Sequence, residues 1–109
     1  MITLIQNATS YLERIALRSD GINYTYEQIL NSSEGIALEL LAGRQHLEEE
    51  RIAFLVPPGF DYVAIQWAIW RAGGIAVPLC VKHPLASIKY VIEDTEASII
   101  VYSEEFESL

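Results

Sequence analysis

Residues 51–78 read RIAFLVPPGFDYVAIQWAIWRAGGIAVP. The apolar run Ile52–Val56 is bounded by Pro57-Pro58-Gly59, which favours a buried strand that ends at a turn. A helix-length segment follows, and after Gly73-Gly74 the chain resumes with the apolar residues Ile75–Val77. This order of strand, helix and strand predicts a right-handed crossover between two parallel strands.

The central helix of this stretch is apolar on nearly every side. Its apolar residues are Phe60, Val63, Ala64, Trp67, Ala68, Ile69 and Ala72. A surface helix carries one apolar stripe, so a helix that is apolar all round belongs in the interior. Trp67 and Trp70 are therefore interpreted as core residues rather than as platforms for a ligand, and we expect the remaining elements to pack around this helix.

The chain after residue 78 continues the same alternation. Pro84 suits the first turn of a helix, whose inner face is formed by Leu85, Ile88, Val91 and Ile92. Ser98–Tyr102 has the composition of a third buried strand. Ser103, followed by Glu104-Glu105, is predicted to cap a last helix.

The chain before residue 51 has a different pattern. Helical spacing of apolar residues predicts an amphipathic helix from about Thr3 to Ile15. Asp20-Gly21 lies between two short apolar runs and predicts a β-hairpin. Thr25 and Gln28 fit a capping box, which opens a helix that we expect to end near Gly43.

These elements predict an α/β fold: a three-layer domain with a small, mostly parallel sheet flanked by helices, preceded by an N-terminal helix and a β-hairpin. The 109 residues, of which 51% are hydrophobic, suffice for one domain with a core. No stretch is both long enough and free enough of charge to span a bilayer, so no transmembrane segment is predicted.

Charge and cysteine content exclude several classes of function. The formal net charge of -8 argues against nucleic acid as a partner, because phosphate binding requires a basic face. The single cysteine, Cys80, excludes an internal disulfide and is compatible with a reducing compartment. Residues 1–7 lack the basic start and long apolar core of a signal peptide, so a cytoplasmic location is expected.

The sequence contains few groups arranged for catalysis. Neither glycine-rich phosphate-binding pattern is present, and His46 and His83 lack the spacing of a metal site or a catalytic triad. Cys80 is interpreted as a small buried hydrophobe rather than a nucleophile, because Lys82 is the one cation near it in sequence. Residues 48–50, three glutamates, are interpreted as a solvated turn. We therefore predict no catalytic residue and no metal ligand.

Two segments carry a family resemblance. Tyr24–Ile29, YTYEQI, resembles the T/S-Y-x-E/Q-L motif that opens a helix in the adenylate-forming acyl-CoA synthetases, the AMP-binding enzymes. Trp70–Leu79, WRAGGIAVPL, resembles the second core motif of that family, K/R-A-G-x-x-x-V-P-L. The similarity covers almost the whole chain, and the additional segments Gln66–Ala68 and Lys82–Pro84 resemble malonyl-CoA synthetases in particular.

The resemblance implies an activity that this chain does not complete. Enzymes of the family activate a carboxylic acid with ATP and Mg²⁺ to an acyl-adenylate, and then transfer the acyl group to coenzyme A (CoA). Their phosphate loop, adenine and metal motifs, acyl pocket and catalytic lysine lie downstream of the region matched here. Residues 1–109 are thus expected to be the N-terminal portion of the large AMP-binding domain, inactive alone and without a bound cofactor, with the remainder of the synthetase chain as partner.

The resemblance also implies one ligand contact. In the family, the loop after the second motif lies near the nucleotide end of CoA, and here this loop is residues 79–83. Cys80, Val81 and Lys82 are the candidate CoA contacts, with Lys82 as the one fixed positive charge. A point charge of this kind can bind phosphate, but a solvated loop lysine is the alternative.

Two other functions stay open at this stage. The first is a self-standing, non-catalytic interaction or oligomerisation module. The second is a small flavodoxin-like nucleotide binder, which is disfavoured because no phosphate-binding loop follows the first buried strand. A portion of a larger domain exposes apolar surface and sheet edges, so the isolated chain is expected to form a homo-oligomer. The acyl substrate is not named by the sequence.

Overall fold

The computed structural model describes residues 3–103 and residue 105. The elements are α1 (Thr3–Ala8), β1 (Ile15–Ser19), β2 (Ile22–Thr25), α2 (Tyr26–Leu41), β3 (Arg51–Leu55), α3 (Phe60–Arg71), β4 (Ile75–Pro78), α4 (Leu85–Thr95) and β5 (Ile99–Tyr102). The last helix predicted after Ser103 lies outside the described residues. No helix in the described part of the chain is long and apolar enough to cross a membrane.

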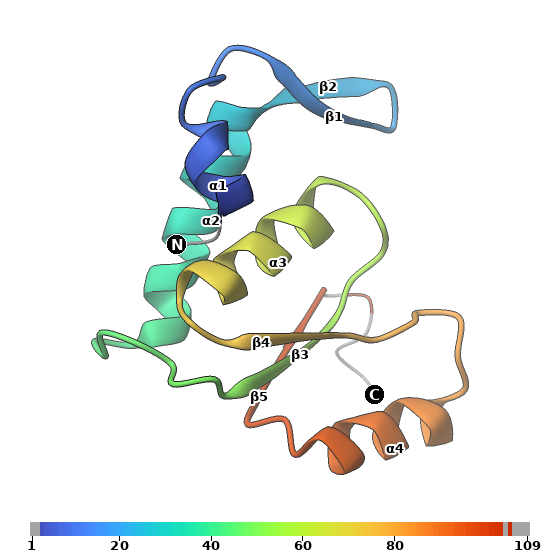
Figure 1. The fold of residues 1–109 in the computed structure, drawn as a ribbon. Coiled ribbons are helices and arrows are strands. Elements are labelled where there is room, and N and C mark those ends of the chain that lie inside the picture. The colour runs from blue at the N-terminus through green and yellow to red at the C-terminus, as the bar shows by residue number, and fades with distance from the viewer. Residues whose placement is uncertain (1–2, 104, 106–109) are drawn as a thin grey trace.

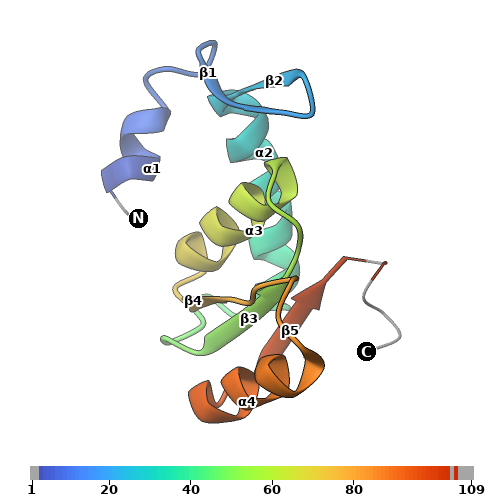
Figure 2. The ribbon, with the colours of Figure 1, turned by 90° about the vertical axis from the view of Figure 1, so that its right-hand side faces the viewer.

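The main sheet has three parallel strands in the order β4-β3-β5. The chain steps from β3 outward to β4 and then back past β3 to β5. Because crossovers between parallel strands are right-handed, these opposite steps place α3 and α4 on opposite faces of the sheet, as Figures 1 and 2 show. The predicted α/β fold with a small parallel sheet flanked by helices is confirmed.

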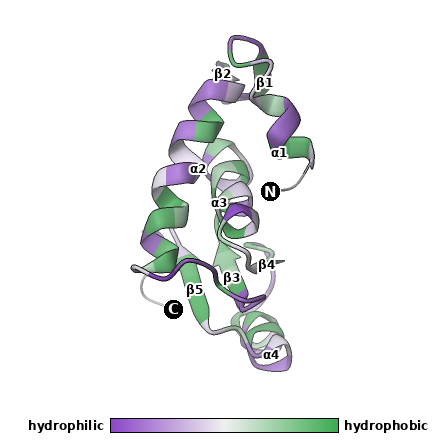
Figure 3. Ribbon diagram, turned by 60° about the vertical axis from the view of Figure 1, so that its left-hand side comes forward, coloured by the Kyte–Doolittle hydropathy of each residue, from purple (hydrophilic) through white to green (hydrophobic). Residues whose placement is uncertain are grey.

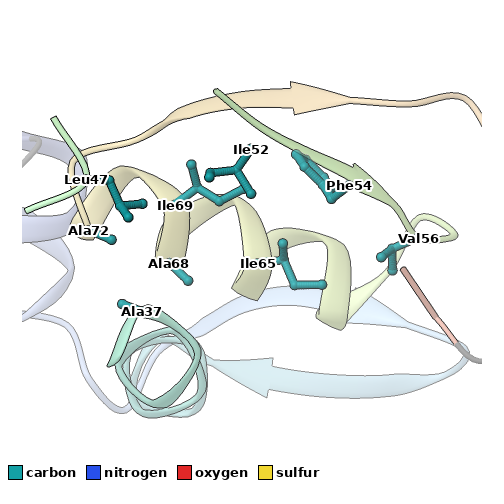
Figure 4. Packing of buried hydrophobic residues seen from close by; sticks show 9 residues of the cluster. All are labelled: Ala37, Leu47, Ile52, Phe54, Val56, Ile65, Ala68, Ile69 and Ala72. Carbon is teal, nitrogen blue, oxygen red and sulfur yellow. The ribbon is translucent and has the colours of Figure 1, made fainter. Parts of the chain in front are cut away.

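The larger core lies on the α3 side of the sheet. Its buried members are Ala37, Leu47, Ile52, Phe54, Val56, Ile65, Ala68, Ile69 and Ala72. Figure 4 shows α3 between the sheet and α2, which contributes Ala37 to the cluster. A helix that is apolar all round needs two partner surfaces, and α3 has the sheet on one side and α2 on the other. The interior position predicted for α3 is confirmed, and α2 adds a layer outside it.

The first strands form a separate antiparallel hairpin at the other end of the molecule (Figure 1). Asp20 and Gly21 have φ values of 52° and 78°, the two positive values that a tight hairpin turn requires. The hairpin packs on the start of α3 through Tyr24, whose ring stacks on that of Phe60 with centroids 4.3 Å apart. The predicted hairpin is confirmed.

The N-terminal helix is shorter than predicted. It ends at Ala8 instead of Ile15, and Ile15 is the first residue of β1. The carbonyls of Leu12 and Arg14 accept hydrogen bonds from the amides of Glu27 and Tyr26, which draws this segment into contact with the start of α2. Tertiary hydrogen bonding therefore overrides the helical spacing of the apolar residues.

The helix α2 begins and ends as predicted. The Gln28 amide donates to Thr25 Oγ1 at 3.3 Å, and the Thr25 amide donates to Gln28 Oε1 at 2.8 Å, which completes the capping box. After Leu41 the backbone turns left-handed at Ala42 (φ 48°) and Gly43 (φ 91°), which ends the helix.

Candidate functional site

The carboxyl ends of the parallel strands define the candidate site. Ligands of open α/β sheets bind outside these ends, in the loops that follow the strands. After β4 the buried Leu79 holds the loop to the sheet, because its amide donates to the Phe54 carbonyl at 2.9 Å. The chain then reverses in a turn that the His83 amide closes by donating to the Cys80 carbonyl at 3.1 Å.

The three residues predicted for this loop are brought together but differ in exposure. Cys80 and Lys82 are exposed, and Val81 is half-buried against the cluster beneath α4. The prediction that Cys80 is buried is wrong, because Leu79 occupies the core position and Cys80 begins the turn. Within the described residues, Lys82 forms neither an ion pair nor a side-chain hydrogen bond, so its charge is free to bind a ligand.

An open hollow of about 410 Å³ adjoins this loop. It is lined by His83, Ala86, Ser87, Tyr90 and Val91. Tyr90 is 67% exposed, the largest exposed fraction among the large hydrophobic side chains described. Tyr90 is not among the ligand contacts predicted from the sequence. Its position gives a signal, because an aromatic residue two positions from the inward-facing Ile88 lies on the outer side of the helix, where core packing does not explain it.

The basic residue of the second motif has a structural role. Arg71, at the end of α3, donates from Nη1 to the Leu30 carbonyl at 2.8 Å and to Ser33 Oγ at 2.9 Å. Ser33 is the one buried polar residue of the described chain and also donates to the Leu30 carbonyl, at 3.2 Å. Arg71 therefore joins α3 to α2 and is not directed at a ligand. This contact cannot be read from a sequence pattern, because the partners of Arg71 lie 38 and 41 residues away along the chain.

The glycine pair of the same motif forms a close backbone junction. Gly73 has a φ of 86° and lies against the His46 ring, such that an added Cβ would be 2.2 Å from His46 Cε1. The His46 Nδ1 atom in turn accepts a hydrogen bond from the Glu48 amide at 2.7 Å. The Glu49 amide donates to the Gly73 carbonyl at 2.9 Å, so this turn holds the segment that precedes β3.

The glutamate run before β3 is only partly a solvated turn. Glu48 and Glu49 are exposed, whereas Glu50 accepts hydrogen bonds from Arg44 Nη1 at 2.8 Å and from Ser98 Oγ at 3.1 Å. The hydrogen bond from Arg44 lowers the pKa of Glu50 below its usual value of 4.5, and the bond from Ser98 acts in the same direction. Glu50 thus ties the start of β3 to the residue before β5.

The described residues do not assemble a metal site. No three His, Cys, Asp or Glu side chains among them gather closely enough to hold a metal ion. In the described part of the chain, the β4–α4 loop carries the exposed Lys82, and the hollow beside it is lined by His83 and the exposed Tyr90.

Comparison with known families decides the relationship. A profile of the family described as AMP-binding enzyme matches residues 4–109. The chain belongs to this family. The chain is 39% identical over 103 residues to the mitochondrial malonate–CoA ligase ACSF3 of Homo sapiens, covering 91% of this chain and 18% of that protein. It is 33% identical over 110 residues to the Xenopus laevis protein of the same name, covering 97% of this chain and 19% of that protein. The chain therefore spans about a fifth of the length of these relatives.

Solved structures of adenylate-forming enzymes share the fold of this chain. Unliganded o-succinylbenzoate CoA synthetase (MenE) of Bacillus subtilis superposes with a TM-score of 0.84 at 25% identity, over 95% of this chain and 23% of that one. The same enzyme in complex with ATP and magnesium gives 0.85 at 25% identity, over 96% and 28%. The N-terminal subdomain of Klebsiella oxytoca NpsA gives 0.83 at 16% identity, over 94% and 26%. The whole described unit thus corresponds to a recurring part of these larger enzymes.

Proposed function

We propose that this chain forms the N-terminal part of an ATP-dependent acyl-CoA synthetase. The observation that supports this function is the match of residues 4–109 to the AMP-binding family, together with 39% identity to a malonate–CoA ligase. In the proposed reaction a carboxylate oxygen attacks the α-phosphate of ATP, and pyrophosphate leaves. The CoA thiol then attacks the acyl carbon of the adenylate, and AMP leaves as the thioester forms. Malonate is the first substrate to test.

The part played by residues 1–109 in this enzyme is that of a scaffold. The described residues provide a parallel sheet, its covering helices and the loops that follow β3 and β4 at the carboxyl edge. The groups that hold ATP and Mg²⁺ and the catalytic residues belong to the remainder of the synthetase. The chain alone should therefore show no tight ATP binding. Calorimetric titration with MgATP tests this, and a specific micromolar site on the isolated chain would contradict the scaffold role.

The β4–α4 loop is proposed to contact CoA through Cys80, Val81 and Lys82. Support comes from the exposed position of Lys82, its lack of an ionic partner among the described residues, and the neighbouring hollow with the exposed Tyr90 ring. Lys82 would bind a phosphate of CoA as a point charge, and the ring would offer a face to the adenine base. CoA supplies the thiol for the second half-reaction, and this loop would only orient its nucleotide end.

Kinetics of the complete enzyme test the Lys82 contact. Lys82→Ala should raise KM for CoA several-fold and leave the ATP-dependent adenylation half-reaction unchanged. Lys89→Ala is the matched control, because Lys89 is an exposed lysine on α4 outside the loop. Equal KM values for CoA in the parent and Lys82→Ala would leave Lys82 as a solvated lysine with no role in binding.

The function itself is tested on the polypeptide encoded by the reading frame that contains this sequence. That polypeptide is assayed for formation of malonyl-CoA and AMP from malonate, ATP, Mg²⁺ and CoA. Thioester formation that depends on both ATP and CoA supports the proposal. Absence of acyl-CoA with malonate and with other short carboxylic acids would refute it.

A self-standing interaction module is the second candidate function. The exposed apolar residues Ile100 and Tyr102 on β5 favour it, because such surface promotes pairing. For the isolated chain we propose a homo-oligomer, which light scattering at high concentration tests, and a clean monomer would count against it. Sequencing the gene beyond codon 109 separates the two functions, since a stop codon there favours the module.

The cellular location of the protein is also a proposal. A cytoplasmic location agrees with the use of a single, exposed cysteine. Several relatives carry the word mitochondrial in their names. Fractionation of cells that express the complete protein distinguishes the two, and recovery in the mitochondrial fraction would contradict the cytoplasmic prediction.

A further inference from the structure

The connection between α2 and β3 ends in a strained turn. Figure 3 shows this connection as a mostly purple, hydrophilic segment that leads from α2 to β3. The Glu50 amide donates to the Leu47 carbonyl at 3.1 Å and closes the turn. Its two central residues, Glu48 and Glu49, have φ values of 54° and 64°. Left-handed values of this kind are costly for residues that carry a Cβ, so further contacts must hold the turn.

The first three amides of the turn all have a hydrogen-bond partner. Those of Leu47 and Glu49 donate to the two carbonyls of residues 72–73, at 2.8 Å and 2.9 Å, and so bind the turn that follows α3. The Glu48 amide donates instead to a side chain, at 2.7 Å from the Nδ1 atom of His46. The strained turn is thus held by two backbone acceptors and one imidazole.

The hydrogen bond to His46 exists only while Nδ1 carries no proton. A neutral imidazole accepts through one nitrogen and donates through the other, whereas an imidazolium donates through both. Protonation therefore directs two N–H groups, at Nδ1 and at the Glu48 amide, toward each other. The ring also lies against Gly73, where an added Cβ would meet its Cε1 and Nε2 atoms. A ring that moves away from the Glu48 amide leaves this contact as well.

The charged groups near His46 do not restore the lost bond. The turn after α3 offers none, because residues 72–75 are uncharged and Arg71 directs its guanidinium at α2. The charged residues of the α2–β3 connection and its flanks are Glu39, Arg44, Glu48, Glu49, Glu50 and Arg51. Arg44 and Glu50 pair with each other, so an imidazolium would turn to the exposed carboxylates of residues 48–49. Attraction between exposed charges is weak in water, and it leaves the Glu48 amide without an acceptor.

We propose that His46 is a proton-sensitive latch between the α2–β3 turn and the α3–β4 junction. The neutral ring holds the Glu48 amide and rests on Gly73, and the protonated ring releases both. Histidine changes its charge between about pH 5 and pH 8. The stabilisation given by the latch is therefore present at the upper end of this range and is lost as the pH falls. The pKa of Glu50 is lowered below 4.5 by Arg44, so the Glu50 carboxylate stays ionised throughout and does not cause the change. The latch does not depend on the proposed function.

Nuclear magnetic resonance of the 109-residue chain tests the latch. Proton–nitrogen correlation spectra of the imidazole identify the nitrogen that carries the proton, and at about pH 8 we expect His46 Nδ1 to carry none. The protection factor of the Glu48 amide, corrected for the intrinsic exchange rate, should fall about 2- to 13-fold as His46 titrates, since one hydrogen bond is lost. His83, the other histidine, is the internal control, because its protonation in the β4–α4 loop should leave Glu48 unchanged. A proton on Nδ1 at pH 8, or constant protection of Glu48 while His46 titrates, would overturn the inference.

Two substitutions distinguish a latch from a ring that only packs. The Oδ1 atom of asparagine is bonded to Cγ as Nδ1 is in histidine, and it cannot gain a proton. His46→Asn should therefore keep the Glu48 amide protected across the whole pH range. His46→Ala removes the acceptor and should leave the amide poorly protected at every pH. The same pH dependence in His46→Asn as in the parent would contradict the inference, because another group would then be titrating.

The complete polypeptide provides the same readout where the 109-residue chain does not fold alone. Hydrogen exchange followed by mass spectrometry of peptides that cover residues 46–50 reports the protection of the turn. We expect this protection to fall with pH in the parent and to stay constant in His46→Asn. Protection that is independent of pH in the parent would overturn the inference.

Discussion

Replacing Gly73 by alanine tests the backbone junction between α3 and β4. The φ of 86° is costly for any residue with a Cβ, by about 1–2 kcal/mol. The new Cβ would also lie 2.2 Å from the His46 ring, so the ring must move. Its movement removes the 2.7 Å hydrogen bond from the Glu48 amide to Nδ1, which contributes about 0.5–1.5 kcal/mol. The two effects together predict a loss of about 1.5–3.5 kcal/mol of unfolding free energy.

The assay is thermal unfolding followed by circular dichroism. For a domain of this size, 1 kcal/mol corresponds to a change of about 4–8 °C in melting temperature. A double variant with His46→Ala separates the two causes, because the backbone strain remains and the ring contact does not. In the His46→Ala background, Gly73→Ala should lower the free energy of unfolding by about 0.5–1.5 kcal/mol less than it does in the parent. Gly73→Val should be more destabilising than Gly73→Ala, since a β-branched residue fits a positive φ worse.

Two other glycines serve as comparisons. Gly35, within α2, has no atom within 4 Å of an added Cβ, so Gly35→Ala should stabilise the chain by up to about 1 kcal/mol. At Gly74 an added Cβ would lie 3.0 Å from Leu47 Cδ1 and 3.2 Å from the Glu50 carbonyl oxygen. Gly74→Val should therefore lower the melting temperature whether or not His46 is present. A Gly73→Ala variant with the same melting temperature as the parent would refute this prediction and show that the turn accepts a Cβ without strain.

Three further perturbations have defined outcomes. Arg71→Met should lower the free energy of unfolding by about 1–3 kcal/mol, because the hydrogen bonds to Leu30 and Ser33 are lost. Arg71→Lys should recover only part of this loss, and unchanged unfolding in urea would contradict the prediction. Because the pKa of Glu50 is lowered in the folded state, Glu50 adds stability above pH 4.5 that is lost as the pH falls through its folded pKa. Glu50→Gln should flatten the fall in melting temperature between about pH 5 and pH 3, and parallel curves for parent and variant would exclude this role. Thr25→Ala should remove the capping box and lower the free energy of unfolding by about 1 kcal/mol. A variant with the same melting temperature as the parent would contradict this prediction.

Local signals account for the part of the fold that could be predicted. The apolar run of β3 ends at three turn residues, and α3 is apolar all round, so strand, helix and strand were visible before any contact was known. The capping box of α2 and the Asp20-Gly21 turn need no information beyond four consecutive residues. Each of these features has a cause that lies within a short stretch of chain.

Contacts between distant residues account for what could not be predicted. The end of α1 is set by hydrogen bonds from Tyr26 and Glu27, which no spacing of the first fifteen residues reveals. The role of Arg71 depends on Ser33, and the exposure of Cys80 depends on Leu79 having taken the core position. In the candidate site the loop was predicted from the family motif, whereas Tyr90 and the neighbouring hollow required the packing of α4.

The exchange of labelled pyrophosphate into ATP tests whether the protein is an adenylate-forming synthetase. This exchange reports the first half-reaction alone, since it requires reversible formation of the acyl-adenylate from malonate and ATP. We expect malonate-dependent exchange by the polypeptide of the complete reading frame, and none by the 109-residue chain. Malonate-dependent exchange by the 109-residue chain alone would contradict the scaffold role of this chain. Absence of exchange by the complete polypeptide with every carboxylic acid tried would contradict the proposed synthetase function.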